Sequence, residues 1–447
     1  MHTYLFYDIE TTGLNKSFDQ VVQFAAIRTD KDLNFLESYE YKVKLNKDVI
    51  PSPYALITHR IGISDLDDGL TEYEAIKKIH KLLNEPNTIS LGYNTLGFDD
   101  EFLRFSFYRN LLTPYTHQFA NNCKRMDIFP IAVMFHLFKN EIIKWPKLEG
   151  KTSLKLEQLN FANKLASGQA HDAMVDVKAT LALAKLFFQE KNMWDYLADF
   201  FNKHVDLKRV ADLKDQMALV LDGFFGADNF YQCPAILLGN HLHYKNQLLW
   251  LRLDTEDLTK TTIDNVKETT RVINKKPGEP SFILPMKDRF VKLSKERLEL
   301  AQKNLKWLHD NPKKYDIIAN HYKEYKHPTY ENTDIDASLY LNGFMSQTEQ
   351  RFCDNFHKST IEEKIKMTKD LNSSNIKTIS ERVLARNFNQ SFDNFNNLIK
   401  QSEVIDFQGR VKLTKEKALE QITEIKDSLK LDARQNELLD ELKAYIT

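Results

Sequence analysis

The sequence predicts an α/β protein that begins with a helix-covered mixed sheet and continues into a small β-containing domain and an all-α C-terminal domain. Strand-like and helix-like segments alternate over the first 190 residues, and short apolar runs broken by Gly and Pro follow. The last hundred residues are polar, helix-rich and almost free of Gly and Pro. Because 447 residues are enough for two or three domains, we predict boundaries that give domains 1–190, 191–345 and 346–447.

The first region can be assigned element by element. Short apolar runs indicate strands, and apolar residues three or four positions apart indicate the buried face of a helix. The expected strands cover residues 4–9, 21–29, 40–45 and 88–93. The expected helices cover residues 72–84, 99–108 and 170–188. Three strands, a helix, a fourth strand and further helices are typical of a mixed sheet layered with helices.

The chain changes character after about residue 205. Residues 219–253 contain apolar and aromatic runs separated by Gly223, Gly226, Pro234 and Gly239, which predicts a small antiparallel β unit. Helical periodicity returns from residue 296, in ERLELAQKNLKWLHDN.

Composition narrows the class of protein. A content of 42% apolar and 28% charged residues is typical of a globular protein. There is no run of 18 apolar residues and no basic-then-apolar leader at the N-terminus, so we expect no membrane association and a cytoplasmic location. The three distant cysteines, Cys123, Cys233 and Cys353, predict free thiols rather than a metal site or a disulfide framework.

Charge indicates that any nucleic-acid site is local. The whole chain has a net charge of −1, so it does not attract nucleic acid by bulk charge. Residues 271–314, however, contain 12 Lys or Arg against 5 Asp or Glu, a net charge of +7. This segment is where a phosphate backbone could bind. The alternative is a solvated basic helix without a ligand.

A pair of carboxylates lies at the end of the first expected strand. Asp8 and Glu10 are two residues apart, so they project from the same face of a strand while Ile9 enters the other layer. Two close carboxylates repel each other unless a cation lies between them. The alternative is a solvated acidic strand end.

A second acidic segment is GYNTLGFDDEF, residues 92–102. A strand ends near Tyr93, Asn94 and Gly97 form a turn, and Asp99 and Asp100 fall in the first turn of the next helix. The alternative is helix capping, because carboxylates also interact favourably with the positive end of a helix dipole.

The third segment is AHDAMVDVKAT, residues 170–180. His171 lies at the start of the long helix, and Asp176 would be an unfavourable inward charge unless it is paired or bound to metal. Asp172 is better explained as a capping residue. A hydrogen-bonded structural histidine is the alternative for His171.

Together the three segments predict a catalytic site. Asp8, Glu10, Asp99 and Asp176 provide the oxygen ligands that Mg²⁺ or Mn²⁺ prefers. Two such ions can stabilise the attacking and leaving oxygens of a phosphoryl displacement. His171 is then the natural general base, because histidine titrates near neutral pH.

The three segments resemble the motifs of the DEDDh exonuclease superfamily, and further segments resemble the bacterial exodeoxyribonuclease I family within it. The motifs are DIETTG, GYNTLGFDDEF and AHDAMVDVKAT. The further segments are QFAAIRTD, FYRN, QAHDAMVDVKATLALAKL, SLYLNGF and ARNF. The similarity extends over nearly the whole chain. It implies a ribonuclease H-like exonuclease domain, an SH3-like β domain and a helical domain around a channel for single-stranded DNA.

The resemblance also implies an activity and site residues. The activity is 3′ to 5′ hydrolysis of single-stranded DNA, with release of nucleoside 5′-monophosphates and a role in DNA repair and recombination. Asp8, Glu10 and Asp176 match the metal ligands of two Mg²⁺ ions, with Mn²⁺ as an alternative. Asp99 matches the remaining carboxylate and His171 the general base, and Glu10 also matches a contact to the terminal nucleotide.

Substrate contacts follow from the same resemblance. Lys155 stands where the family has an arginine. The lysine keeps the positive charge but cannot make the two parallel hydrogen bonds that a guanidinium makes. The other implied or candidate contacts are Arg104, Tyr115, Phe119, Tyr196, Tyr340 and Phe344. Aromatic rings stack on bases regardless of sequence, although any one of them could instead belong to the core.

The resemblance implies one macromolecular partner besides single-stranded DNA. This is single-stranded DNA-binding protein, whose acidic C-terminal tail would bind a basic surface of an otherwise monomeric enzyme. Two other functions stay open. One is an RNA-trimming or proofreading 3′ exonuclease of the same superfamily, and the other is a non-catalytic single-strand-binding module.

Overall fold

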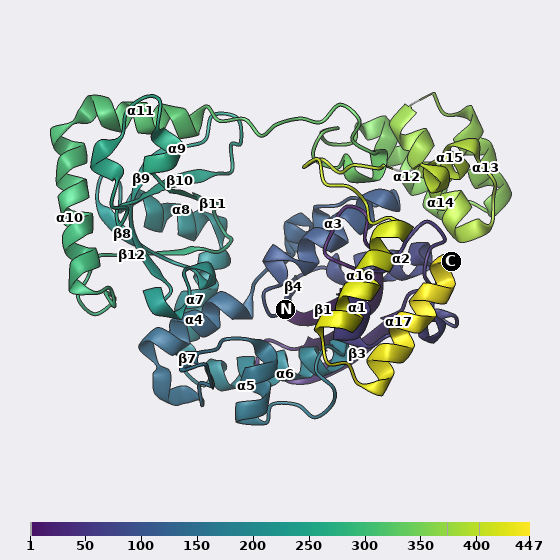
Figure 1. Ribbon diagram of the computed structural model, residues 1–447, viewed down its shortest axis with the longest axis horizontal. Coiled ribbons are helices and arrows are strands. Elements are labelled where there is room, and N and C mark those ends of the chain that lie inside the picture. Colours follow the sequence, from purple (N-terminus) through teal and green to yellow (C-terminus); the bar gives the residue numbers. More distant parts are fainter. Residues whose placement is uncertain (1, 373, 402) are drawn as a thin grey trace. The chain divides into compact units, whose positions relative to one another are not determined.

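The computed structural model describes residues 2–372, 374–401 and 403–447, and they form two compact units (Figure 1). The first unit comprises Met1–Arg125, Ala166–Lys178 and Pro328–Thr447. The second comprises Met126–Leu165 and Ala179–His327. Each unit therefore combines segments that are distant in sequence. The domain boundaries expected after residues 190 and 345 stay a prediction.

A five-stranded mixed sheet forms the centre of the first unit. Its strands are β1 (Thr3–Thr11), β2 (Val21–Thr29), β3 (Phe35–Lys42), β4 (Thr88–Leu91) and β5 (Lys124–Arg125), in the order β3-β2-β1-β4-β5. Strand β1 is antiparallel to β2 and parallel to β4, and β4 is parallel to β5. This arrangement confirms the predicted mixed sheet.

Alternation along β1 decides which residues enter the core. Leu5, Tyr7 and Ile9 belong to one apolar cluster with Ile76 and Phe102. The last two residues come from α2 (Glu72–Leu83) and α3 (Asp99–Arg109), which cover that face of the sheet. Since alternate side chains of a strand point to opposite faces, Asp8 and Glu10 project away from these helices.

Several of the expected boundaries are wrong, and the strand expected over residues 88–93, for example, ends at Leu91. The strand expected over residues 40–45 is β3, which ends at Lys42 and is an edge strand with mostly exposed side chains. Apolar patterning cannot locate such a strand, because neither of its faces is fully buried. The helix expected from residue 170 is α6 (Ala173–Phe188), because His171 adopts a left-handed conformation with φ of 61°.

The C-terminal part of the first unit is helical, as predicted. Its helices are α12 (Gln347–Lys358), α13 (Ile361–Asp370), α14 (Ser374–Phe388), α15 (Asp393–Lys400), α16 (Lys415–Ser428) and α17 (Ala433–Ile446). Helices α16 and α17 pack on α1 (Pro53–His59) through a cluster that includes Leu56, Ile422, Leu438 and Leu442. The helical region thereby shares a core with the sheet region.

The second unit contains the predicted antiparallel β structure. Its main strands are β8 (Met217–Leu221), β9 (Gln232–Asn240), β10 (Leu248–Arg252), β11 (Val272–Lys275) and β12 (Phe282–Pro285), in the order β11-β10-β9-β8-β12. All neighbours in this sheet are antiparallel. A short hairpin joins β6 (Lys147–Leu148) to β7 (Lys151–Thr152).

The second unit also contains several helices. They are α4 (Ile128–Phe138), α5 (Leu156–Asn163), α7 (Lys191–Ala198), α8 (Lys203–Ala211), α9 (Val266–Thr269), α10 (Lys295–Asp310) and α11 (Pro312–Lys323). Helix α10 confirms the periodicity seen from residue 296. Strands β11 and β12 were not predicted, since they are only four residues long and lie in a segment rich in charge.

Among the described helices, none is both long enough and apolar enough to cross a membrane. Cys123, Cys233 and Cys353 are free and buried, as predicted.

Candidate active site

Asp8 and Glu10 lie where β1 continues past the end of β4. The last residue pair of these two strands is Phe6 with Leu91, whereas β1 runs on to Thr11. On its other side, β1 remains paired with β2, and Glu10 lies opposite Gln23 of β2. Both side chains are partly exposed. The sheet therefore presents two carboxylates at an open strand end.

Asp99 reaches the same strand end from the turn that follows β4. A Cβ atom on Gly92 would lie 2.4 Å from the carbonyl oxygen of Tyr7, so only glycine lets the turn pass this close to β1. Asn94 then turns the chain with φ of 63°. Asp99, the first residue of α3, accepts a 3.2 Å hydrogen bond at Oδ1 from the Ile9 N–H. Asp99 is thus bound to the peptide between Asp8 and Glu10.

His171 and Asp176 come from the start of α6. Asp172 Oδ1 accepts hydrogen bonds from the N–H groups of Met174 and Val175, each at 3.1 Å, which confirms its capping role. Asp176 lies in the first turn of the helix, and its N–H donates to the Asp172 carbonyl. The left-handed His171 immediately before this cap directs the chain into the helix.

These segments meet in one cluster. Ligand atoms of Glu10, His171 and Asp176 all lie within 4.8 Å of one another. Burial raises the pKa of Asp8 well above its ordinary value, and the charges of Asp99, Glu10, Asp176 and Asp172 raise it further. Burial, followed by Asp176, Asp99 and Asp172, likewise raises the pKa of Glu10.

A divalent cation bound at this cluster would relieve the repulsion between its carboxylates. Carboxylates that raise one another's pKa are stabilised when a cation binds between them. The donor set of carboxylate oxygens with one imidazole suits a divalent metal ion. The residues present therefore fit a divalent metal ion, and the geometry places an atom of His171 within ligand reach beside those of Glu10 and Asp176.

Asp100, the acidic neighbour of Asp99, has a structural role. It is buried, and its Oδ2 contacts Arg104 and Arg125, each at 2.6 Å, while Oδ1 bonds His117 at 2.8 Å. Burial acts to raise the pKa of Asp100, but Arg125, Arg104 and His117 outweigh it and hold the pKa well below its ordinary value. Asp100 is therefore a paired anion that anchors α3, in agreement with the absence of a predicted ligand role.

His59 is a neighbour of the cluster that sequence reasoning did not identify. It ends α1, is 5% exposed, and accepts a 3.0 Å hydrogen bond at Nδ1 from the Ile61 N–H. Burial lowers the pKa of His59 to about 4, and the charge of His171 lowers it further, while the backbone of Thr11 acts in the opposite direction. His59 is neutral at pH 7, with its proton on Nε2. No spacing in the sequence connects residue 59 with the three motifs.

Several predicted substrate contacts gather in the first unit. The rings of Tyr115 and Phe344 meet edge-on at 5.8 Å, and the Arg104 guanidinium lies 5.7 Å from the Tyr115 ring centre. Phe344 is 86% exposed, whereas Arg104 is largely used by its ion pair with Asp100. Tyr340 packs on Phe105 and Phe407 and donates a hydrogen bond to Glu101. Phe119 is 69% exposed.

The other two predicted contacts, Lys155 and Tyr196, lie in the second unit. Lys155 is exposed before the first turn of α5, with Nζ 3.9 Å from Glu157. Tyr196 is partly exposed on α7, and the Arg209 guanidinium lies 4.3 Å from its ring centre. Both therefore combine a surface position with positive charge.

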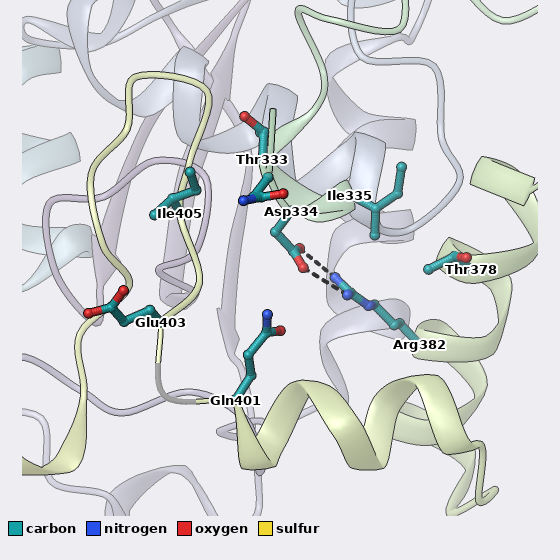
Figure 2. A pocket seen from close by; sticks show the side chains of 9 residues that line it. Thr333, Asp334, Ile335, Thr378, Arg382, Gln401, Glu403 and Ile405 are labelled. Atoms are coloured by element: carbon teal, nitrogen blue, oxygen red, sulfur yellow. Dashed lines mark hydrogen bonds and ion pairs between the residues drawn. The ribbon is translucent and has the colours of Figure 1, made fainter. Parts of the chain in front are cut away.

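A separate cavity of about 490 Å³ lies in the C-terminal region of the first unit. Figure 2 shows Asp334 and Arg382 on its wall, joined by two hydrogen bonds of 2.5 and 2.8 Å. Thr378, Gln401 and Glu403 also line it. None of the predicted site residues is among its lining residues, so the cavity is distinct from the acidic cluster.

Comparison with known proteins agrees with this geometry. Residues 5–184 match the RNase T family, described as "Exonuclease", and residues 333–447 match "Exonuclease I C-terminal domain". Exodeoxyribonuclease I of Escherichia coli strain K12 is 31% identical over 374 residues, which is 78% of this chain and 78% of that protein.

Solved structures extend the similarity to the whole chain. The structure of E. coli exonuclease I in complex with a dA16 oligonucleotide has a TM-score of 0.88 and 25% identity, covering 100% of this chain and 99% of that chain. The zinc-ion-bound form of the E. coli ExoI–ssDNA complex has a TM-score of 0.84 and 25% identity, covering 100% and 98%. The first of these likenesses matches the mixed-sheet, antiparallel and helical regions described above. With its acidic cluster and both matched regions, the chain belongs to the exodeoxyribonuclease I family of hydrolases.

Proposed function

We propose that this protein is a divalent-metal-dependent exonuclease that removes nucleoside 5′-monophosphates from the 3′ end of single-stranded DNA. The observation that carries the proposal is the meeting of Glu10, His171 and Asp176 ligand atoms within 4.8 Å. Asp8 and Asp99 complete this cluster, since their charges act on one another. Exodeoxyribonuclease I of E. coli matches the chain, and two solved structures of that enzyme hold DNA, one a dA16 oligonucleotide and one ssDNA.

Each residue of the cluster has its own role in the proposed reaction. Asp8, Glu10 and Asp176 hold the metal, and Asp99 supports it while holding the Ile9 peptide. His171 accepts the proton of a water molecule that attacks the terminal phosphodiester. Bound Mg²⁺, two ions in our proposal with Mn²⁺ as an alternative, supplies charge stabilisation of the attacking and leaving oxygens. Glu10 also contacts the terminal nucleotide.

Substrate binding uses rings and cations outside this cluster. Phe344, which is exposed and packs edge-on against the partly buried Tyr115, can stack on unpaired bases, and the exposed rings of Phe119 and Tyr340 are further candidates. Arg104, which is paired with Asp100, holds its guanidinium 5.7 Å from the Tyr115 ring centre and so positions that ring. Lys155 binds backbone phosphate, and Tyr196 with Arg209 offers a second stacking surface. Stacking on exposed rings requires unpaired bases, so duplex DNA is a poor substrate.

The test compares matched oligonucleotides labelled at either end. We expect Mg²⁺-dependent release of mononucleotides from a 3′-labelled DNA strand, early loss of the 3′ label, and no release in the presence of EDTA. The Asp176→Ala variant should bind the strand but not shorten it. Equal shortening by this variant and the wild type would contradict the assignment of the cluster.

The same experiment separates the two alternatives. An RNA-trimming enzyme would degrade an RNA strand of the same sequence faster than the DNA strand. A non-catalytic binding module would retain both strands intact under every metal condition. The proposal predicts neither result, because the full set of five residues is present and the relatives act as exodeoxyribonucleases.

A protein partner is proposed from charge. The exposed lysines of the basic segment are Lys276, Lys287, Lys292, Lys295, Lys303, Lys306 and Lys313. Such a surface would attract the acidic C-terminal tail of single-stranded DNA-binding protein. Lys275 cannot take part, since it is buried with Nζ 2.6 Å from Asp206. Titration of a synthetic tail peptide into the protein tests this, and Lys303→Glu should weaken binding.

Oligomeric state, location and cellular role complete the proposal. We propose a cytoplasmic monomer that acts in DNA repair and recombination. The mass of the single chain is 52.4 kDa, so light scattering at working concentration distinguishes a monomer from a dimer.

A further inference from the structure

A buried glutamine connects the two sides of the acidic cluster. Gln23 lies on β2, directly opposite Glu10 in the strand register, and is 3% exposed. Directly opposite residues of paired strands project to the same face of a sheet. The Gln23 side chain therefore points to the face that carries Asp8 and Glu10, where α6 begins.

The oxygen and the nitrogen of the Gln23 side-chain amide each have one hydrogen-bond partner. Its Oε1 accepts a 3.3 Å hydrogen bond from the Ala173 N–H, the first residue of α6. Its Nε2 donates a 3.1 Å hydrogen bond to Glu40 Oε1 on β3. A backbone N–H requires an acceptor and a carboxylate requires a donor, so the two partners allow only one orientation of the amide.

This bond completes the N-terminus of α6. The first N–H groups of a helix have no partner inside the helix and need one from elsewhere. Asp172 binds those of Met174 and Val175 through its side chain. Gln23 binds that of Ala173, the first residue of the helix. The helix start is thereby fixed to the strand that lies beside Glu10.

We propose that Gln23, oriented by Glu40, is a positioning residue that fixes His171 and Asp176 relative to Glu10. The inference rests on the proposed function for its catalytic consequence, although the hydrogen bonds themselves do not. Ala173 lies two residues after His171 and three before Asp176, so a shift at this point moves both. Glu10 belongs to a different element and would not follow, and the cluster would open.

The test uses a reciprocal pair of substitutions. Gln23→Met removes both polar ends at similar volume, and Gln23→Glu places two carboxylates face to face. The double variant Gln23→Glu with Glu40→Gln restores one donor and one acceptor in exchanged positions. Gln232→Met is the matched control, because that buried glutamine also bridges two backbone groups, Phe290 O at 2.7 Å and Lys292 N at 2.8 Å, within the second unit.

The first measurement is hydrogen exchange of the metal-free protein at the start of α6. We expect the Ala173 amide to exchange roughly fivefold faster in Gln23→Met, as expected for the loss of one buried hydrogen bond, and also faster in Gln23→Glu, where repulsion from Glu40 displaces the acceptor. The double variant should return to the wild-type rate. Unchanged exchange in Gln23→Met, or a double variant no better than Gln23→Glu, would overturn the inference.

The second measurement is nucleotide release with Mg²⁺. Both single variants should lose kcat by roughly 10-fold or more while KM for the strand stays within about twofold, as for groups that orient metal ligands. The double variant should recover kcat, and Gln232→Met should keep it. Unaltered kcat in a Gln23→Met protein that exchanges faster would overturn the positioning role. If the wild type itself releases no nucleotide, the proposed function fails while the exchange result still decides whether Gln23 fixes α6.

Discussion

The main-chain N–H of Ile9 donates a 3.2 Å hydrogen bond to Asp99 Oδ1, and this bond joins two segments that are 90 residues apart in the chain. The peptide that donates it lies between the two acidic residues of β1. Asp99 therefore has two tasks, since it holds the strand through one oxygen and adds negative charge beside Asp8.

Substitution of Asp99 can separate these two tasks. Asp99→Asn keeps an oxygen acceptor for the Ile9 N–H but removes the charge, so we expect a folded protein that has lost nucleotide release. Asp99→Leu also removes the acceptor and should lower the free energy of unfolding by about 1–3 kcal/mol, the usual result of leaving a buried donor unsatisfied. Urea unfolding and an activity assay of both variants check this. Equal stability of the two variants would contradict the structural task.

His171 can be tested without disturbing its backbone. Asparagine tolerates the left-handed conformation that His171 adopts at φ of 61°, so His171→Asn removes the imidazole with little strain. We expect kcat to fall by about 10²–10⁴-fold, the usual contribution of a general acid or base. Fluorescence anisotropy should give unchanged affinity for single-stranded DNA. Exposed His243 provides the control, and His243→Asn should leave kcat unaltered.

Metal binding should be linked to stability and pH through Asp8. Its pKa is raised in the folded protein, so the metal-free protein loses stability as pH rises through that pKa and Asp8 becomes charged. Asp8→Asn should therefore raise the melting temperature of EDTA-treated protein at pH 8, with a smaller gain at pH 5. Added Mg²⁺ should stabilise the wild type and not the variant. A variant that melts below the wild type in EDTA would contradict the repulsion.

A buried ion pair predicts the opposite pH dependence. Burial acts to raise the pKa of Asp48, but Arg386 and Lys412 outweigh it and hold the pKa well below its ordinary value of 3.8. This stabilisation is present above pH 4 and is lost as pH falls through the depressed pKa. Asp48→Asn should cost about 3–5 kcal/mol at pH 7, as when one partner of a buried pair is removed, and less at pH 3.

The control for Asp48 is a pair on the surface. Asp32 contacts Lys31 at 2.7 Å with its side chain 54% exposed, and Asp32→Asn should change the free energy of unfolding by less than about 1 kcal/mol. Urea titrations of both variants at pH 7 and pH 3 provide the comparison. Equal losses at the two pH values would show that Asp48 does not act through its charge.

Phe344 should contribute to strand binding and not to chemistry. Its ring is 86% exposed beside Tyr115, so a base can stack on it without rearrangement. Phe344→Ala should weaken binding of single-stranded DNA by roughly fivefold or more, as for one lost stacking contact, with kcat at saturation unchanged. Phe35, which is 60% exposed on the edge strand β3, is the control in the same unit. Equal effects of the two substitutions would exclude a specific stacking role.

The elements that build the site could be predicted because their patterns are local. Asp8 and Glu10 follow an apolar run, and the odd-numbered residues beside them, Leu5, Tyr7 and Ile9, enter the core as alternation requires. The start of α3 at Asp99 also agrees with expectation. In each case the signal lies within about ten residues of the side chain that it positions.

Other features depend on contacts that the sequence does not display. Strand β3 lies at an edge with exposed side chains, so its register on β2 leaves no apolar pattern. Gln23 becomes a partner of Ala173 only when strand pairing brings it beside α6, 150 residues later in the chain. His59 nears Thr11 through tertiary packing of α1. The residues that support the site therefore required the fold, while the residues that form it did not.

The packing of α1 against α16 and α17 has a consequence for protein synthesis. Asp8, Glu10, Asp99, His171 and Asp176 are all translated more than 260 residues before Leu438. The apolar side of α1, with Leu56 and Ile57, stays uncovered until Leu438 and Leu442 have been made. The ion pair between Arg60 and Asp432 likewise cannot form until Asp432 has been made. A nascent chain that already carries every proposed catalytic residue thus still lacks part of the core of the first unit, and the apolar side of α1 is covered only after α17 has been made.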